Sequence, residues 1–185
     1  MGVETELKMK VDSHERVRAA LRASGAMGVG SVMEINRFFD KPDRALLAED
    51  RGLRIRTNAG SEQTTHIVTY KGPREKGPMK RREEIEFSVD DPQAAAQVLT
   101  ALGYQLVLAF EKRRESWELG GCKVELDEVP HLGTFVEIEG ADEKSIAAVQ
   151  KMLRLEESAS IADSYIALLM AWREQNNIAH REIRF

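Results

Sequence analysis

Acidic and basic side chains occupy every second position of the N-terminal segment 3–10. The charged set is Glu4, Glu6, Lys8 and Lys10, and the set between them is Val3, Thr5, Leu7 and Met9. A helix would turn Glu6 away from Glu4 and Lys8, whereas a strand puts all the charged residues on one face. Carboxylates suit hard cations such as Mg²⁺ or Mn²⁺, and lysines suit phosphate groups. The segment therefore predicts a strand whose charged face is suited to a metal-bound polyphosphate.

The same two-sided alternation recurs along the chain, most clearly in Leu53-Arg54-Ile55-Arg56 and in the segments 82–87 and 122–127. It predicts eight strands, at about 3–11, 32–40, 51–58, 64–71, 80–88, 105–117, 121–128 and 133–140. Short links such as Gly120-Gly121 favour antiparallel neighbours. Capping residues predict helices at about 13–24, 91–102 and 142–153, and a fourth that starts at Asp163.

Two folds are compatible with this alternation. The simpler one is an antiparallel sheet with an apolar inner face and a solvated charged face. The other is a closed barrel whose charged faces point inward, where opposite charges or a charged ligand must compensate each other. Solvated faces usually mix in Ser, Thr, Asn and Gln, but nearly every polar-face position here is Glu, Asp, Lys or Arg. This composition favours the barrel.

The overall composition excludes several classes of protein. The 185 residues hold 31 acidic residues against 27 Lys plus Arg, so the basic field of a nucleic-acid coat is missing. One cysteine and four scattered histidines exclude an internal disulfide and disfavour a Cys- or His-rich metal centre. With no apolar run of membrane-spanning length and no signal region, we expect a soluble cytoplasmic protein. We expect one domain at 1–175 and a polar tail at 176–185.

Nine sequence blocks, in order, resemble the CYTH domain, which is also called the triphosphate tunnel metalloenzyme superfamily. The blocks are Glu4-Thr5-Glu6-Leu7-Lys8, Phe38-Phe39-Asp40, Leu53-Arg54-Ile55-Arg56, Thr69-Tyr70-Lys71-Gly72-Pro73, Arg82-Glu83-Glu84-Ile85-Glu86, Glu111-Lys112-Arg113-Arg114, Leu126-Asp127-Glu128-Val129, the segment 132–139, and Ser164-Tyr165. The resemblance implies an α+β fold: an eight-stranded antiparallel closed β-barrel, the triphosphate tunnel, with helices packed outside.

The resemblance also implies roles for individual residues. The metal ligands for Mg²⁺ or Mn²⁺ would be Glu4, Glu6, Glu137 and Glu139, completed or supported by Glu84 and Asp127. The triphosphate would be bound by Lys8, Arg54, Arg56, Lys71, Arg82, Lys112 and Arg114, of which the first four would also act in catalysis. Glu86 and Glu125 share the charged faces with weaker support from the resemblance, and Arg113 is expected to face outward. His66, His131 and Cys122 are expected at packing or surface positions, and Trp117 and Trp172 in the core.

Within the family that this sequence resembles, two reactions use the same metal ligands and basic residues. A cyclase lets the ribose 3′-oxygen of ATP attack the α-phosphorus, whereas a hydrolase directs water at the terminal phosphorus of tripolyphosphate or thiamine triphosphate. The segments 67–73 and 102–104 resemble the class IV adenylyl cyclase group, and a late basic residue of some thiamine triphosphatases has no clear match here. A non-catalytic polyphosphate-binding module is the third alternative. We expect a small-molecule triphosphate as partner, no nucleic acid and no membrane, and leave a homodimer open.

Overall fold

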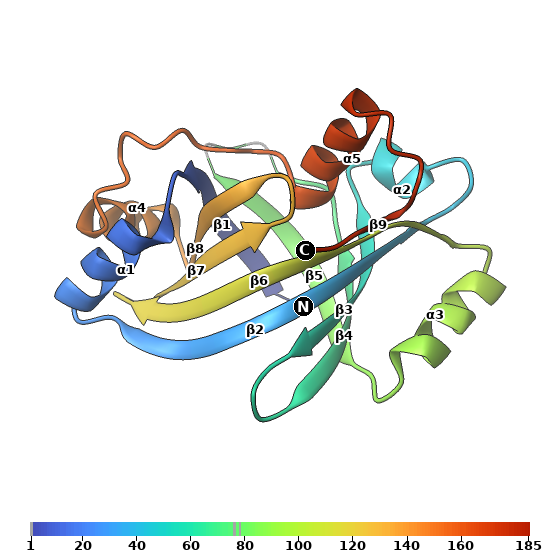
Figure 1. Cartoon of the computed structure of the whole chain (residues 1–185), viewed down its shortest axis with the longest axis horizontal. Coiled ribbons are helices and arrows are strands. Elements are labelled where there is room, and N and C mark those ends of the chain that lie inside the picture. Colours follow the sequence, from blue (N-terminus) through green and yellow to red (C-terminus); the bar gives the residue numbers. More distant parts are fainter. Residues whose placement is uncertain (1, 76, 78) are drawn as a thin grey trace.

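Eight strands form a ring of antiparallel neighbours (Figure 1). A computed structural model describes residues 2–75, 77 and 79–185, with the backbone alone for residues 2–4. The strands are β1 (Gly2–Val11), β2 (Met27–Asp40), β3 (Gly52–Ala59), β4 (Thr64–Lys71), β5 (Lys80–Ser88), β6 (Gln105–Leu119), β7 (Cys122–Val129) and β8 (Gly133–Gly140). Their order is β2-β3-β4-β5-β1-β8-β7-β6, and β6 pairs again with β2. The predicted closed barrel is confirmed, and the sheet with a solvated charged face is wrong.

The register of the strands brings the charged faces together inside the ring. In the register of β1 and β8, Glu6 lies opposite Glu139 and Lys8 lies opposite Glu137. Residues directly opposite each other in a sheet point to the same side, so one inward-facing residue fixes the direction of its partners. The alternation therefore delivers the charged sets of β1, β3 and β8 to the interior, whereas β6 places Lys112 and Arg114 inside and Arg113 outside.

Five helices accompany the barrel within the described residues. They are α1 (His14–Ala23), α2 (Ala45–Ala48), α3 (Pro92–Ala101), α4 (Glu143–Met152) and α5 (Tyr165–Gln175). The side chains of Ser13, Asp91, Asp142 and Ser164 accept hydrogen bonds from the first turns of α1, α3, α4 and α5. The four predicted helices are thus present, and the cap of the last one is Ser164, one residue after the predicted Asp163. Among the described helices, none has the length and apolar character needed to cross a membrane.

The short helix α2 was not predicted, because it depends on one carboxylate outside it. Asp40, at the end of β2, accepts hydrogen bonds from the backbone nitrogens of Lys41, Leu46 and Leu47. A four-residue helix has too few internal hydrogen bonds to be stable alone. Asp40 therefore fixes the turn that carries the chain from β2 to β3.

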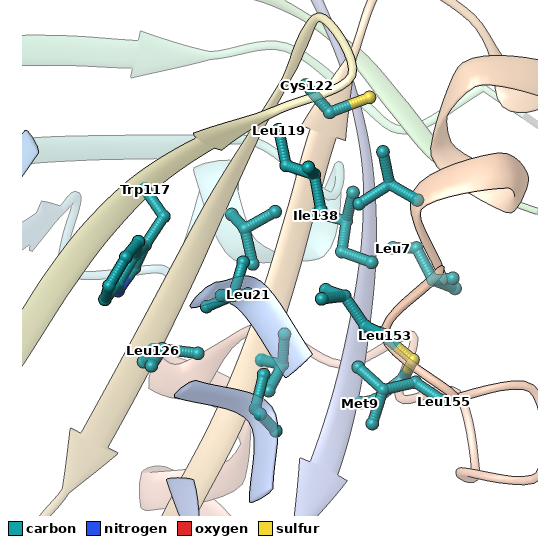
Figure 2. Close-up of a cluster of buried hydrophobic side chains, with 14 of the residues drawn as sticks. Leu7, Met9, Leu21, Trp117, Leu119, Cys122, Leu126, Ile138, Leu153 and Leu155 are labelled. Carbon is teal, nitrogen blue, oxygen red and sulfur yellow. The ribbon is translucent and has the colours of Figure 1, made fainter. Parts of the chain in front are cut away.

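Helices cover three clusters of apolar side chains on the outer surface of the barrel, whereas Ile85 and Phe87 of β5 stay exposed. Figure 2 shows the largest cluster, in which Leu7, Met9 and Ile138 of the barrel meet Leu21 of α1 and Leu153 after α4. Trp117 and Cys122 belong to the same cluster, so Trp117 is a core residue and Cys122 a packing residue, as predicted. A second cluster joins α5 to β6, and a third joins α3 to β3 and β4.

The C-terminal residues 176–185 pack against β6. Strand β9 (Glu182–Ile183) runs parallel to β6, with Ile183 opposite Phe110 and almost fully buried. The backbone nitrogen of Phe185 donates to Glu111 Oε2 at 3.1 Å, and its ring lies 3.9 Å from the guanidinium of Arg113. The polar tail therefore occupies an edge of the sheet that β7 leaves unpaired.

Gly140, at the end of β8, gives a test of the outer core. A Cβ there would lie 2.8 Å from Cys122 Sγ and 3.0 Å from Ile146 Cγ1, which is too close for either buried group. We expect Gly140→Ala to destabilise the protein by about 1–3 kcal/mol, measured by denaturant unfolding. Gly28→Ala is the control, because its Cβ would meet the Trp117 ring at ordinary distances of 3.7–3.9 Å. Equal losses for both variants would contradict this account of the packing.

Candidate functional site

The interior of the barrel is a cavity of about 540 Å³ with a highly charged wall. All seven residues predicted to bind the triphosphate line it: Lys8, Arg54, Arg56, Lys71, Arg82, Lys112 and Arg114. Four of the predicted metal ligands line it as well: Glu6, Glu84, Glu137 and Glu139. Asp127 lies behind the wall with no solvent exposure, and the side chain of Glu4 lies outside the described residues. Every barrel strand contributes to this wall.

The acidic side of the cavity is formed by β1 and β8. Glu6 accepts a hydrogen bond from Lys80 of the neighbouring β5, two positions from Arg82 on the same face. Lys8 Nζ lies 3.3 Å from Glu137 Oε1 and donates to the backbone oxygen of Asp163 at 3.0 Å. Each of these acids therefore already faces a lysine, which offsets the cost of removing both charges from water.

Glu34 of β2 lies at the centre of the charged interior and was missed from the sequence. Its carboxylate is 3.2 Å from Arg56 Nη1 and 3.2 Å from Lys112 Nζ, and it also accepts from Asn36. Burial would raise the pKa of Glu34, but Lys112, Arg114 and Arg56 hold the pKa well below its usual range. The sequence places Glu34 on the same strand face as Asn36 and Phe38, which could have indicated that it points inward. A single acid between Met33 and Ile35 did not stand out, however, because such residues are common on solvated strand faces.

Arg114 and Asp127 form the most tightly bonded pair. Arg114 donates to both oxygens of Asp127, at 2.7 Å from Nε and 2.6 Å from Nη2. Asp127 Oδ2 also accepts from Lys112 Nζ at 3.1 Å and from the Tyr165 hydroxyl at 2.9 Å. With its lone pairs used by four protein donors, Asp127 is arranged to orient the cations at the cavity wall. This geometry suits the supporting role that was predicted for it better than direct ligation.

Tyr165 is the second residue that sequence reasoning left out of the site. Burial, then the charges of Asp127 and Glu137, raise the pKa of Tyr165 well above its ordinary value. The hydroxyl is therefore protonated at neutral pH and available as a donor. The pair Ser164-Tyr165 was noticed only as part of the resemblance, because nothing in a helical segment indicates that its first residue points into a barrel.

On the arginine-rich side of the cavity, guanidinium N–H groups lack a hydrogen-bond partner in the described chain. The Nε atoms of Arg54, Arg56 and Arg82 are buried and have no hydrogen-bond partner within the described part of the chain. Burial, followed by repulsion from Arg56, lowers the pKa of Arg54 to about 10. Unpaired buried donors next to like charges are costly. An anion in the cavity would relieve the repulsion between Arg54 and Arg56.

Asp50 holds two arginines at the mouth of the cavity. Arg82 Nη2 donates to the backbone oxygen of Asp50 at 3.0 Å, and Arg74 Nε approaches the Asp50 carboxylate at 2.8 Å. Arg74 also donates to the backbone oxygen of Ala162 at 2.9 Å. Three loops far apart in the sequence are thereby joined where Arg82 enters the cavity.

The acids in the cavity have the right chemistry for a hard cation. Within residues 5–75, 77 and 79–185, whose side chains are described, no three His, Cys, Asp or Glu residues gather closely enough to form a metal site. Glu6 and Glu139 nevertheless occupy paired positions on β1 and β8. Mg²⁺ is commonly held by one or two carboxylates together with substrate phosphates and water. The donor set therefore fits an ion that arrives with a polyphosphate.

The remaining predictions from the sequence concern residues near the site. Glu86 lines the cavity, and Glu125 is buried and paired with Arg114 and Lys123. Arg113 faces outward, where it pairs with Glu128. The expected non-ligands stay clear of the cavity: His66 hydrogen-bonds Thr57, and His131 stacks on Trp172, which packs against the second cluster.

Glu34 makes the buried charges testable through pH. Because its folded-state pKa is lowered, its ionised form stabilises the protein fully above about pH 4.3, the value for an unfolded glutamate, and the stabilisation is lost as pH falls through the folded-state pKa. We expect Glu34→Gln to cost about 3–5 kcal/mol at pH 7, because Arg56, Lys112 and Arg114 each lose one buried carboxylate partner. The deficit should shrink at lower pH.

The measurement is thermal or denaturant unfolding of the wild type and Glu34→Gln from pH 7 downward. Glu128→Gln is the matched control, because this glutamate pairs with Arg113 on the exposed surface, and it should stay within about 0.5 kcal/mol of the wild type. A Glu34→Gln deficit that does not change with pH would contradict the assignment of a buried carboxylate.

Known proteins resemble this chain over most of its length. A family model described as the CYTH domain matches residues 2–165. A Methanocaldococcus jannaschii protein named "Putative adenylate cyclase" is 32% identical over 149 residues, or 80% of this chain and 81% of that protein. An Aeromonas hydrophila protein named "Adenylate cyclase CyaB" is 32% identical over 136 residues, or 73% of this chain and 67% of that protein.

Solved structures share the fold. The PH1819 protein of Pyrococcus horikoshii has a TM-score of 0.81 and 28% identity, covering 92% of this chain and 99% of its own. A Hippeastrum protein has a TM-score of 0.72 and 18% identity, covering 93% of this chain and 96% of its own. Its structure is described as that of a "putative adenylyl cyclase" that reveals a dominant triphosphatase activity.

Proposed function

Because the chain belongs to the CYTH family, we propose that it is a divalent-metal-dependent enzyme acting on a triphosphate inside its barrel. The observation that carries the proposal is that all seven predicted Lys and Arg side chains, from several strands, line one cavity of about 540 Å³. A ligand suited to them is anionic, fits inside this cavity, and presents many oxygen acceptors. A triphosphate chain meets all three requirements.

The seven basic residues would bind the phosphates. Arginine forks bind phosphoryl oxygens in pairs, and lysines act as point charges. The ion pairs described above hold Lys8, Lys112 and Arg114 in place before a substrate arrives. Preorganised charges of this kind stabilise the charge that develops on phosphoryl oxygens during transfer, which is the main contribution a protein makes to this chemistry.

The acids of β1 and β8 would hold the divalent ion. Glu6 and Glu139 are neighbours across the strand pair, and Glu4 precedes Glu6 on the same face of β1. The ion, Mg²⁺ or Mn²⁺, would polarise the phosphoryl oxygens that it shares with the substrate. Before it binds, Lys80 neutralises Glu6, so this lysine must give up its contact to make room.

We propose ATP as substrate and cyclisation as the reaction. The two relatives at 32% identity are both named adenylate cyclase, and the name of the Methanocaldococcus jannaschii protein includes the word "Putative". In cyclisation the 3′-hydroxyl gives up its proton to solvent water and its oxygen forms a bond to the α-phosphorus. The bond from that phosphorus to the oxygen that bridges it to the β-phosphorus breaks, and pyrophosphate leaves with that oxygen. The basic residues would orient the chain and take up the charge of the leaving group.

Hydrolysis of tripolyphosphate or thiamine triphosphate is the second candidate. The Hippeastrum protein shares the fold and is described with a dominant triphosphatase activity, so this barrel is compatible with attack on a terminal phosphorus. The same cations and acids would serve, with water as the nucleophile. A non-catalytic polyphosphate-binding module ranks third, because binding phosphate alone does not require a cavity so rich in carboxylates.

Product analysis separates these candidates. The protein is incubated with ATP, tripolyphosphate or thiamine triphosphate in the presence of Mg²⁺ or Mn²⁺, and we expect cyclic AMP and pyrophosphate from ATP. Arg54→Ala should lower turnover by about 10²–10³-fold, because one preorganised donor is lost. Arg113→Ala is its matched control on the outer surface and should leave turnover unchanged.

Other outcomes have definite meanings. Release of terminal phosphate without cyclic AMP identifies a hydrolase. Binding of all three compounds without any product identifies a binding module. Equal effects of Arg54→Ala and Arg113→Ala would contradict the barrel interior as the site.

The metal dependence can be tested through Glu6. We expect chelation to abolish turnover, Mg²⁺ or Mn²⁺ to restore it, and excess Ca²⁺ to inhibit, because Ca²⁺ prefers a larger and less regular coordination shell. Glu6→Ala should lower turnover by orders of magnitude and keep the fold. Lys10→Ala is the control, since Lys10 is exposed near the end of the same strand. Full turnover after exhaustive chelation, or in Glu6→Ala, would rule out this metal site.

A further inference from the structure

Tyr165 reaches the charged cavity from a helix outside the barrel. It is the first residue of α5 and is 8% exposed. Its ring centroid lies 4.1 Å from Lys8 Nζ and 5.2 Å from Lys112 Nζ, and its hydroxyl donates to Asp127 Oδ2 at 2.9 Å. One aromatic side chain therefore contacts two predicted phosphate-binding lysines and the acid behind them.

The ring offers both lysines a partner that leaves their charge intact. The face of an aromatic ring attracts a cation, and the attraction grows when both are removed from water. Both lysines already face carboxylates, Lys8 that of Glu137 and Lys112 those of Glu34 and Asp127. The ring adds a further contact to each lysine without adding negative charge that would compete with phosphate. Lys8 is also fixed by the backbone oxygen of Asp163, so residues 163–165 hold it at two points.

The Tyr165 hydroxyl contacts Asp127, which lies behind the cavity wall. Asp127 is fully buried and accepts from Lys112, Arg114 and the Tyr165 hydroxyl. Lys112 and Arg114 line the cavity, and Asp127 does not. The hydroxyl therefore helps to fix the orientation of the carboxylate that aims these two cations.

Packing keeps the ring in this position. It meets Phe135 edge to face, with centroids 5.1 Å apart and an interplanar angle of 74°. Leu169, one turn further along α5, is buried in the same cluster as Phe135 and Ile183. A helix that lies outside the barrel is thereby anchored next to the lysines.

We infer that Tyr165 is a positioning residue that orders Lys8 and Lys112 by its ring, and Lys112 again by its hydrogen bond to Asp127. Its effect on catalysis rests on the proposed function, whereas the ordering of the lysines does not. Tyr165 acts through these neighbours, so its loss disorders the cations and weakens the binding of a polyphosphate.

Two substitutions separate the ring from the hydroxyl. Tyr165→Phe keeps the ring and removes the hydrogen bond, and Tyr165→Leu removes both. Tyr104→Phe is the matched control, because Tyr104 packs in the third cluster between α3 and the barrel and does not line the cavity. Nuclear magnetic resonance of ¹³C-lysine-labelled protein reports on each lysine, with Lys8→Arg and Lys112→Arg used to assign the signals.

The expected pattern differs for the two lysines. In the wild type, the CεH₂ protons of Lys8 and Lys112 are shifted upfield by the ring. Tyr165→Phe should move the Lys112 signal and leave the Lys8 signal in place, and Tyr165→Leu should remove the ring shift from both. Calorimetric titration with tripolyphosphate and Mg²⁺ should give a Kd raised about tenfold in Tyr165→Leu and less than about threefold in Tyr165→Phe. Tyr104→Phe should match the wild type.

The outcomes that overturn the inference are distinct from those that overturn the proposed function. Unshifted lysine signals in the wild type, or shifts that persist in Tyr165→Leu, would overturn the ordering role. If Tyr165→Leu fails to fold, the Tyr165→Phe spectrum decides, because equal movement of the two lysine signals or of neither contradicts the assignment. If the wild type binds no tripolyphosphate, the proposed function falls, and the lysine signals alone decide whether Tyr165 orders Lys8 and Lys112.

Discussion

The pairing of buried charges is the constraint on which the rest of this structure depends. A barrel interior filled with lysines, arginines, glutamates and aspartates is stable only if each charge removed from water has an opposite charge near it. Asp127 and Glu34 compensate one part of the wall, because between them they contact Arg56, Lys112 and Arg114. Other acids, such as Glu137 beside Lys8, compensate the rest. The ion pairs are therefore part of the fold and of the candidate site at once. A substrate that enters must exchange these contacts for its own, which favours ligands with several closely spaced negative groups.

Opposite charges are not distributed evenly around the cavity wall, so two sides of the cavity differ in charge. On the side of β1 and β8, acids and lysines face each other in near balance. On the side of β3, Arg54 and Arg56 repel each other and share Glu86, while Arg56 also contacts Glu34. A polyphosphate bound between these sides would meet arginines on one side and acids on the other. The acids become favourable only when a cation bridges them to the phosphates.

The two-residue period located the strands and their two faces. The charge-rich composition of the polar faces, together with the resemblance to the CYTH family, then indicated the closed barrel rather than a solvated sheet. Alternate residues of a strand point to opposite faces, so Arg54, Lys71 and Arg114 could be assigned to the inward face once their strands were located. The same argument failed where position depends on tertiary contacts. Helix α2 exists because Asp40 caps it across a turn, and Tyr165 enters the site because Ser164 starts α5 at that residue. Glu34 has the correct parity, but only the closed ring shows that it meets three cations.

Closure of the ring also has a consequence for how the chain folds. β1 pairs with β5 and β8, and β2 pairs with β6, so the contacts that complete the barrel join residues far apart in the sequence. Proteins dominated by such long-range pairings fold slowly, because loop entropy is lost before the contacts form. While the ring is open the charged faces are hydrated, and their water is released when the ring closes. The step that closes the ring is thus also the step at which the charges are desolvated, and ionic strength should act on its rate more than on the pairing of hairpins.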